Sequence, residues 1–205
     1  MFVDLLFPAR GDSICVDHSY PLYAALSRVI PEFHNASTSS MRFAPISGEP
    51  GEPGRLQITD RSHLRVRLPA DAIKGALPLA GKSLDVAGSA VRLGPPSVVP
   101  LCPASALVAR IVTFKHGEEP EAFLKTAKAK LSELGITAEP SIPLIESGPR
   151  AGEARRRVVR LKGQAIVGYA LLVTELTADD SVRLQEQGLG GRTRMGCGFF
   201  LPARG

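Results

Sequence analysis

A proline-rich stretch near the middle of the chain most constrains its fold. Residues 94–103 contain four prolines. Proline fixes φ and has no amide hydrogen, so such a stretch is typical of a stiff linker and breaks a continuous helix or central strand. Strands and helices are expected in a similar order on either side of it. The sequence therefore predicts two domains, residues 1–94 and 105–205, joined by a linker at residues 95–104.

The first half has the periodicities of a strand–helix–strand–strand–helix–strand order. Alternation of apolar and polar residues predicts strands, and apolar residues at helical spacing predict a helix. The expected elements are a strand at 2–7, a helix at 20–30, a short strand near 41–46, a strand at 63–68, a short helix from about 70 and a hairpin at 84–93. This order is the ferredoxin-like one.

The second half repeats this order without repeating the sequence. The expected elements are a strand at 106–114, a helix at 118–134, a hairpin made of 155–162 and 164–173, a helix that opens at Thr177 and ends at Gly188, and a last strand at 198–201. The spacing of Thr177 and Asp180 resembles a capping box. The predicted fold class is thus α+β, with two tandem ferredoxin-like (RRM-like) domains and a C-terminal Gly-rich loop.

Composition excludes several classes of protein. The chain of 205 residues has 25 Lys+Arg against 20 Asp+Glu, and this net charge of +5 permits a polyanionic partner without requiring one. Its three cysteines and four histidines lack the spacing of disulfide frameworks or metal sites, so neither a metal nor another cofactor is expected. No apolar run is long enough to span a bilayer, and no signal peptide is evident. We expect a cytoplasmic protein.

A run of basic residues lies in the expected hairpin of the second half. Its members are Arg155, Arg156, Arg157, Arg160 and Lys162. Alternation would place Arg156, Arg160 and Lys162 on one face of the strand and the other two on the opposite face. A solvated edge that discourages aggregation is one interpretation. Contact with phosphates is favoured, because the run is denser than such an edge needs. Arg65 and Arg67 form a second, weaker basic face.

The C-terminal stretch GLGGRTRMGCGFF, residues 188–200, combines glycines with arginines. Glycine lets backbone amides approach a phosphate closely, and arginine adds charge and paired donors. A flexible turn that leads into an edge strand explains the composition equally well. The aromatic signature of RNA-reading RRM sheets is absent, so base stacking on a sheet is not the expected binding mode.

His34 follows the first expected helix and would lie near one stripe with Tyr23 and Ser27 if the helical path continued. A histidine exposed beside hydroxyl groups can transfer protons near neutral pH. From spacing alone, however, a histidine of this kind is more often structural. The function of His34 therefore stays open at this point.

Taken together, residues 17–34, 155–163 and 184–200 resemble a known family. They are similar to the CRISPR-associated repeat-RNA endoribonucleases of the RAMP superfamily, the Cas6 family, and most of all to the compact subgroup of type I-G (formerly I-U) systems. The resemblance implies two tandem ferredoxin-like domains. It also implies cleavage of CRISPR precursor RNA within each repeat, without a metal ion. In this reaction the 2′-hydroxyl attacks the adjacent phosphate and leaves a 2′,3′-cyclic phosphate.

The resemblance also assigns roles to residues. His34 would be the first choice as general acid or base and His18 the second, with Ser27 as a nearby hydroxyl and Arg42 stabilising the charged phosphorane. The implied RNA-contacting loop consists of Gly190, Gly191, Arg192 and Arg194. The implied partners are CRISPR repeat RNA or crRNA and, as candidates, other subunits of an effector complex. Two alternatives stay open: a non-catalytic crRNA-binding subunit, and a ferredoxin-like protein without a nucleic-acid role.

Overall fold

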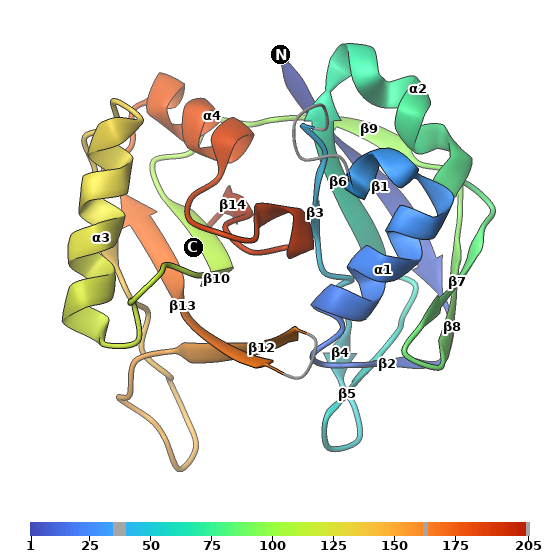
Figure 1. The fold of residues 1–205 in the computed structure, drawn as a ribbon, viewed down its shortest axis with the longest axis horizontal. Coiled ribbons are helices and arrows are strands. Elements are labelled where there is room, and N and C mark those ends of the chain that lie inside the picture. Colours follow the sequence, from blue (N-terminus) through green and yellow to red (C-terminus); the bar gives the residue numbers. More distant parts are fainter. Residues whose placement is uncertain (35–39, 162–163, 204–205) are drawn as a thin grey trace. The chain divides into compact units, whose positions relative to one another are not determined.

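The computed structural model describes residues 1–34, 40–161 and 164–203, and Figure 1 shows their fold. The chain divides into two compact units. Unit 1 comprises Met1–Pro100 and Arg194–Gly196, and unit 2 comprises Leu101–Thr193 and Cys197–Gly205. A short segment of the C-terminal tail therefore belongs to the first unit, whereas the residues on either side of it belong to the second.

Unit 1 is built mainly of antiparallel strands. Its strands are β1 (Phe2–Arg10), β2 (Ser13–Cys15), β3 (Arg42–Ala44), β4 (Glu49–Pro50), β5 (Arg55–Gln57), β6 (His63–Pro69), β7 (Ser83–Val86), β8 (Ser89–Leu93) and β9 (Ser97–Pro100). Its helices are α1 (Ser19–Val29), η1 (Pro31–His34), η2 (Ala70–Ala72), α2 (Ile73–Ala76) and η3 (Leu77–Leu79). The main sheet has the order β3-β6-β1-β8-β7, with β9 also paired to β1, and β2-β5-β4 form a small second sheet.

The core of unit 1 lies on the face of the main sheet that α1 covers (Figure 1). Val3, Leu5 and Phe7 of β1 alternate toward this core, and Leu22 and Leu26 of α1 pack in the same cluster. The alternation in β1 and the helical spacing in α1 explain why each element buries one face. The expected helix at 20–30 is confirmed with a shift of one residue.

The expected linker contains a strand. β9 pairs antiparallel with β1, with Val3 opposite Pro100 and Leu6 opposite Ser97. Proline is compatible with the end of such a strand, because the missing amide removes no bond from the interior of the ladder. The proline-rich stretch therefore begins as part of the sheet of unit 1.

Unit 2 has a five-stranded antiparallel sheet. Its strands are β10 (Leu107–Val112), β11 (Glu139–Ser141), β12 (Arg156–Leu161), β13 (Gln164–Thr174) and β14 (Phe200–Pro202), and its helices are α3 (Pro120–Glu133) and α4 (Ala178–Gln187), while η4 (Thr193–Met195) lies in the tail. The sheet order is β11-β13-β10-β14, with β12 also paired to β13. Thr177 accepts a hydrogen bond of 3.1 Å from the amide of Asp180 and caps α4, as the sequence predicts.

The strand orders of the two units correspond in part. The path β3-β6-β1-β8 of unit 1, which continues to β7, corresponds to the path β11-β13-β10-β14 of unit 2. The predicted α+β class is confirmed. No helix that the structure describes is long and apolar enough to cross a membrane.

Candidate functional site

An aromatic contact joins the end of the first helical segment of unit 1 to strand β3. Phe33 is fully buried in η1, and its ring meets that of Phe43 in β3 edge to face, with centroids 6.3 Å apart. Tyr23 of α1 donates a long hydrogen bond of 3.5 Å to the Phe33 carbonyl. Because His34 follows Phe33 and Arg42 precedes Phe43, this contact holds the backbones of the two candidate residues near each other.

The helical path does not continue to His34. Ile30 has an extended backbone, and Pro31 opens the separate 3-10 helix η1, in which His34 is the last residue. The condition for one helical stripe through Tyr23, Ser27 and His34 is therefore not met, because proline prevents continuation of α1. The side chain of His34 lies outside the described part of the structure.

His18 is fully buried at the start of α1. Its Nδ1 lies 2.7 Å from the Cys15 carbonyl oxygen, so the ring donates a hydrogen bond to the loop before the helix. An acid or base must come within hydrogen-bond reach of the proton that it transfers. A buried ring at the helix start fits a structural role better than direct contact with RNA.

Ser27 is also buried, on the face of α1 that packs against the core. Its hydroxyl has no hydrogen-bond partner among the described residues. Buried polar groups usually have a partner, so this hydroxyl is an unusual feature of the helix. Its burial separates it from solvent.

Arg42 is partly buried in β3 beside another arginine. The register pairs Arg42 with Arg67 of β6, and Arg67 in turn with Asp4 of β1, so the three residues form a row across three strands. Burial lowers the pKa of the Arg42 guanidinium, and the positive charge of Arg67 lowers it further. Arginine remains protonated at neutral pH, so Arg42 supplies a positive charge in a partly desolvated place, where it acts strongly on an anion.

The arginines of β6 have a structural role. Arg67 is 1% exposed and Asp4 is 2% exposed. Arg67 donates to both oxygens of Asp4, at 2.7 Å and 3.0 Å, and Arg65 donates to Asp4 Oδ2 at 2.6 Å. Asp4 balances one of the two positive charges, and its oxygens occupy donors of both guanidinium groups, which are thereby held in the fold. The weaker basic face expected at Arg65 and Arg67 is therefore a buried ion-pair network.

The basic strand of unit 2 is exposed. Within β12, Arg156, Arg157 and Arg160 all face solvent at least in part, and only Val159 of the described side chains is buried. Arg155, just before β12, is half-buried and lies 3.7 Å from Glu146, whose side chain is 91% exposed. Lys162 lies outside the described residues. The exposed arginines form a surface that a polyanion can contact.

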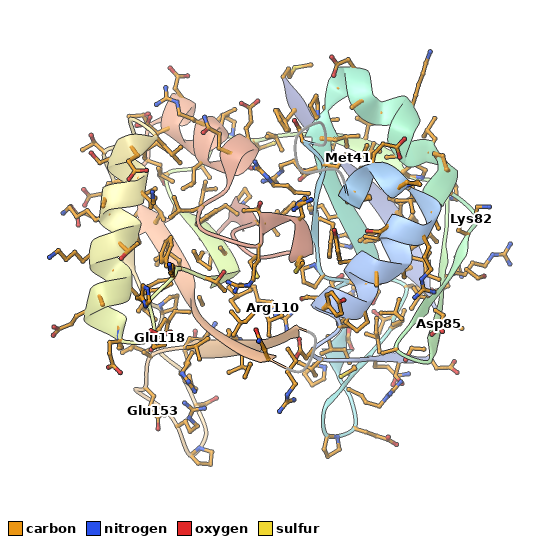
Figure 2. The ribbon with its side chains drawn as sticks, viewed as in Figure 1. Met41, Lys82, Asp85, Arg110, Glu118 and Glu153 are labelled. Atoms are coloured by element: carbon orange, nitrogen blue, oxygen red, sulfur yellow. The ribbon has the colours of Figure 1, made fainter. Side chains whose placement is uncertain are left out.

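Arg157 has further cations beside it. Partial burial lowers the pKa of its guanidinium, and the positive charges of Arg110 and Arg155 lower it further. Arg110 lies in β10, and in Figure 2 it is seen next to β12 and β13. The sequence patterns considered above did not identify Arg110, because a single arginine in an apolar strand gives no local signal.

The glycines of the tail allow close packing on β10. The Gly191 amide donates to the Thr113 carbonyl at 2.8 Å, and the Thr113 hydroxyl donates back to the Gly191 carbonyl at 3.1 Å. A Cβ on Gly190 would lie 2.7 Å from the Thr113 oxygen, and one on Gly198 would lie 2.0 Å from the Leu189 oxygen. These contacts favour a structural role for the glycines over direct phosphate binding by the Gly191 amide.

The arginines of the tail belong to different units. Arg192 is exposed in unit 2, whereas Arg194 is half-buried in the segment Arg194–Gly196 of unit 1. Met195 packs against the core of unit 1, and a Cβ on Gly196 would lie 3.1 Å from Pro45, just after β3. The tail thus presents one cation in each unit.

Among residues 1–34, 40–161 and 164–203, no group of three or more His, Cys, Asp or Glu side chains is placed to hold a metal ion.

Comparison with known proteins identifies the family. The family model of Cas6, described as Cas6 Crispr, matches residues 3–205. The chain is 41% identical over 202 residues to the CRISPR-associated endonuclease Cas6 of Myxococcus xanthus (strain DK1622), covering 98% of this chain and 82% of that protein.

Solved structures share the fold at low sequence identity. A CRISPR associated protein Cas6 has a TM-score of 0.67 at 14% identity and covers 100% of this chain and 99% of its own. A RAMP protein binding different RNA substrates has a TM-score of 0.67 at 12% identity, with 100% of both chains covered. The fold defines the class as an α+β protein with a RAMP-like fold. On the match over nearly its full length, the chain belongs to the Cas6 family.

Proposed function

We propose that this protein is an endoribonuclease that cleaves CRISPR precursor RNA within the repeat and produces mature crRNA. The observation that carries the proposal is the 41% identity, over 98% of the chain, to a protein named as a CRISPR-associated endonuclease. The exposed arginines of β12 support it, because a protein that binds RNA needs cations facing its phosphates. The chemical step and the roles of its residues are those that the family resemblance implies, and the arrangement of unit 1 supports them in part.

Cleavage proceeds without a metal ion. The 2′-hydroxyl attacks the adjacent phosphorus, the bond to the 5′-oxygen breaks, and the products are a 2′,3′-cyclic phosphate and a 5′-hydroxyl. One group must take the proton from the 2′-hydroxyl, and another must supply a proton to the leaving oxygen. His34 is the first choice for this acid–base work, since η1 places its backbone near β3. His18 remains the second choice, because its ring is fully buried and so less able to reach the RNA.

Arg42 stabilises the negative charge that develops on the phosphorane. Its position in β3 is fixed by the adjacent Phe43, and its partly desolvated guanidinium interacts strongly with an anion. Ser27 is buried in α1 and supports the position of the helix. The acid–base group and the charge stabiliser thus come from segments that one aromatic contact holds together.

The RNA backbone is held mainly by unit 2. Arg156, Arg157 and Arg160 of β12 contact phosphates, together with Arg155 just before the strand. Lys162, which lies outside the described residues, is proposed to contribute as well. Arg192 and Arg194 add charge from the tail, whose glycines keep it against β10. We further propose that each unit is a ferredoxin-like domain, since both have the strand order of that fold. Membership of the I-G/I-U subgroup and contact with other effector subunits remain predictions.

The test is cleavage of a labelled RNA carrying the CRISPR repeat of the source genome, in EDTA. The proposal predicts cutting at one position and a 2′,3′-cyclic phosphate on the upstream product. An RNA with a single 2′-deoxy nucleotide before the cleaved bond should bind and stay intact. Cutting of the deoxy RNA would exclude attack by the 2′-hydroxyl. Tight binding of the all-ribose RNA with no cutting would instead indicate a non-catalytic crRNA-binding subunit.

A further inference from the structure

Strand β10 of unit 2 contains an irregularity at Arg110. Ala109 pairs with Leu171 of β13, but Val112 pairs with Tyr169. Two residues of β10, Arg110 and Ile111, therefore lie opposite one residue of β13. This arrangement is a β-bulge, which bends a strand locally and redirects a side chain, and such bulges are frequent beside functional sites.

The bulge changes which residues of β10 face the helices. Ala109 and Val112 both belong to the core cluster that contains residues of α3 and α4. Ile111 instead belongs to a small cluster with Val159 and Cys197. Since successive side chains of a strand point to opposite faces, Arg110 points away from the core face that Ala109 occupies. Arg110 is exposed there.

Arg157 of β12 lies on this same helix-free face. It pairs with Gly168 of β13, whose neighbour Tyr169 belongs to the helix-facing core. Gly168 brings no side chain between Arg157 and β10. A Cβ at that position would lie 2.3 Å from the Val112 oxygen, so only glycine fits. At this register position, therefore, β13 adds no side chain beside Arg157.

Three arginines are close enough to repel one another. The amide of Ala170, the residue opposite the β10 bulge, donates to the Arg155 carbonyl, and Arg157 pairs with Gly168 two residues earlier in β13. Burial lowers the pKa of the Arg157 guanidinium, and the charges of Arg110 and Arg155 lower it further. Arg155 lies 3.7 Å from Glu146, but that side chain is 91% exposed, so the contact is screened by solvent. Clustered cations cost free energy in the unliganded protein, and an anion bound among them offsets that cost.

We infer that Arg110, Arg155 and Arg157 form one binding site for an RNA phosphate on the helix-free face of the sheet of unit 2, with the β10 bulge positioning Arg110. The choice of RNA as the ligand rests on the proposed function. Guanidinium groups suit this ligand because they donate paired hydrogen bonds to phosphate oxygens. The site adds a residue of β10 to a binding surface that otherwise belongs to β12 and the tail.

The test measures affinity for labelled oligouridylate over a range of salt, so that cleavage of a repeat plays no part. The variants are Arg110→Gln, Arg157→Gln and the double substitution, with Arg92→Gln of β8 as a matched loss of one exposed arginine. Arg110→Gln should weaken binding by about threefold to tenfold and reduce the salt slope by about 0.7, the value for one contact to single-stranded RNA. Arg110→Lys should fall between wild type and Arg110→Gln. Thermal melting checks that each variant is folded.

The double variant tests whether the arginines share one phosphate. If they do, the double substitution loses less affinity than the product of the two single losses, because each single variant already weakens the shared contact. A loss equal to that product, or an Arg110→Gln variant that behaves like Arg92→Gln, would overturn the inference. If either of these results were found and the wild-type protein still cut repeat RNA, the proposed function would stand without this phosphate site. If the wild-type protein failed to cut repeat RNA but Arg110 and Arg157 showed the expected coupling, the phosphate site would stand and the proposed function would be wrong.

Discussion

Strands β6 and β12 both carry closely spaced arginines, and the fold uses them in opposite ways. In β6, Arg67 is buried and both it and Arg65 donate to the buried carboxylate of Asp4. In β12, Arg156, Arg157 and Arg160 are exposed, and further cations surround Arg157. The difference is set by the neighbouring strand. β1 offers an acid to β6, whereas β13 offers only neutral residues to β12.

The role of a basic strand therefore depends on its neighbouring strand as well as on its own sequence. A buried arginine must be paired, because a lone charge in the protein interior costs several kcal/mol. An exposed cluster of arginines tolerates its own repulsion because water and salt screen it. The first arrangement stabilises the fold, and the second leaves charge for a polyanion.

The largest effect is expected from removing the acid of β6. Asp4→Ala leaves Arg67 buried without its main counter-charge, and such losses cost about 3–5 kcal/mol. Urea unfolding should show this loss of stability. The exposed acid Asp60 provides a matched control, and Asp60→Ala should change stability by less than about 0.5 kcal/mol. If Asp4→Ala lowered the free energy of unfolding by less than about 1 kcal/mol, the ion pair with Asp4 would not be what stabilises the buried Arg67.

The tail offers an intermediate effect. Gly198 has a φ of 64°, and a Cβ there would lie 2.0 Å from the Leu189 oxygen. Gly148 has a φ of 90° but no atom within 4 Å of its Cβ position. Both alanine variants suffer from the left-handed backbone, but only Gly198→Ala must also displace neighbouring backbone, which costs about 1–3 kcal/mol more.

Equal melting temperatures for the Gly198→Ala and Gly148→Ala variants would contradict close packing of the tail. The exposed Arg192 extends the comparison, because its replacement by Gln should leave stability unchanged and affect RNA affinity alone. The tail would then contain a residue that stabilises the fold, as in β6, and an exposed arginine that binds RNA, as in β12.

The smallest change in stability is expected in β12. Arg156→Glu with Arg160→Glu should alter stability by no more than about 0.5 kcal/mol, because both side chains are exposed. Affinity for RNA should fall by at least about tenfold at low salt, and the difference should shrink as salt rises. Lys74→Glu with Lys82→Glu gives the same charge change in unit 1 and should affect binding much less. Equal losses in the two pairs would show that only net charge matters.

Local patterns in the sequence predict much of the fold. The helical spacing of α1, the cap of α4 at Thr177 and the proline at the start of α3 all correspond to elements of the structure. These signals are local, so they can be recognised in the sequence without knowledge of the tertiary fold. Strand β9, in the expected linker, was missed because prolines usually indicate a break in a strand. Its partner β1 also lies far away in the sequence.

The candidate site could be predicted only in part. The exposure of the β12 arginines agrees with the sequence pattern, but the pairing of Arg67 with Asp4 joins residues 63 positions apart, which no local pattern shows. Arg110 was missed because a single arginine in an apolar strand gives no local signal. His18 is buried and bonded to the Cys15 carbonyl, and the spacing of residues along the chain reveals neither fact.

In the proposed function, residues of unit 1 cut the RNA that the β12 arginines of unit 2 hold. The most direct test measures single-turnover cleavage and affinity for the same repeat RNA in EDTA, with His34→Ala, Arg156→Glu/Arg160→Glu, and His63→Gln as the control histidine. His34→Ala should lose about 10²–10⁴-fold in rate with unchanged affinity. The arginine variant should bind weakly and cut at a near wild-type rate once saturated. Wild-type cutting by His34→Ala would contradict the account.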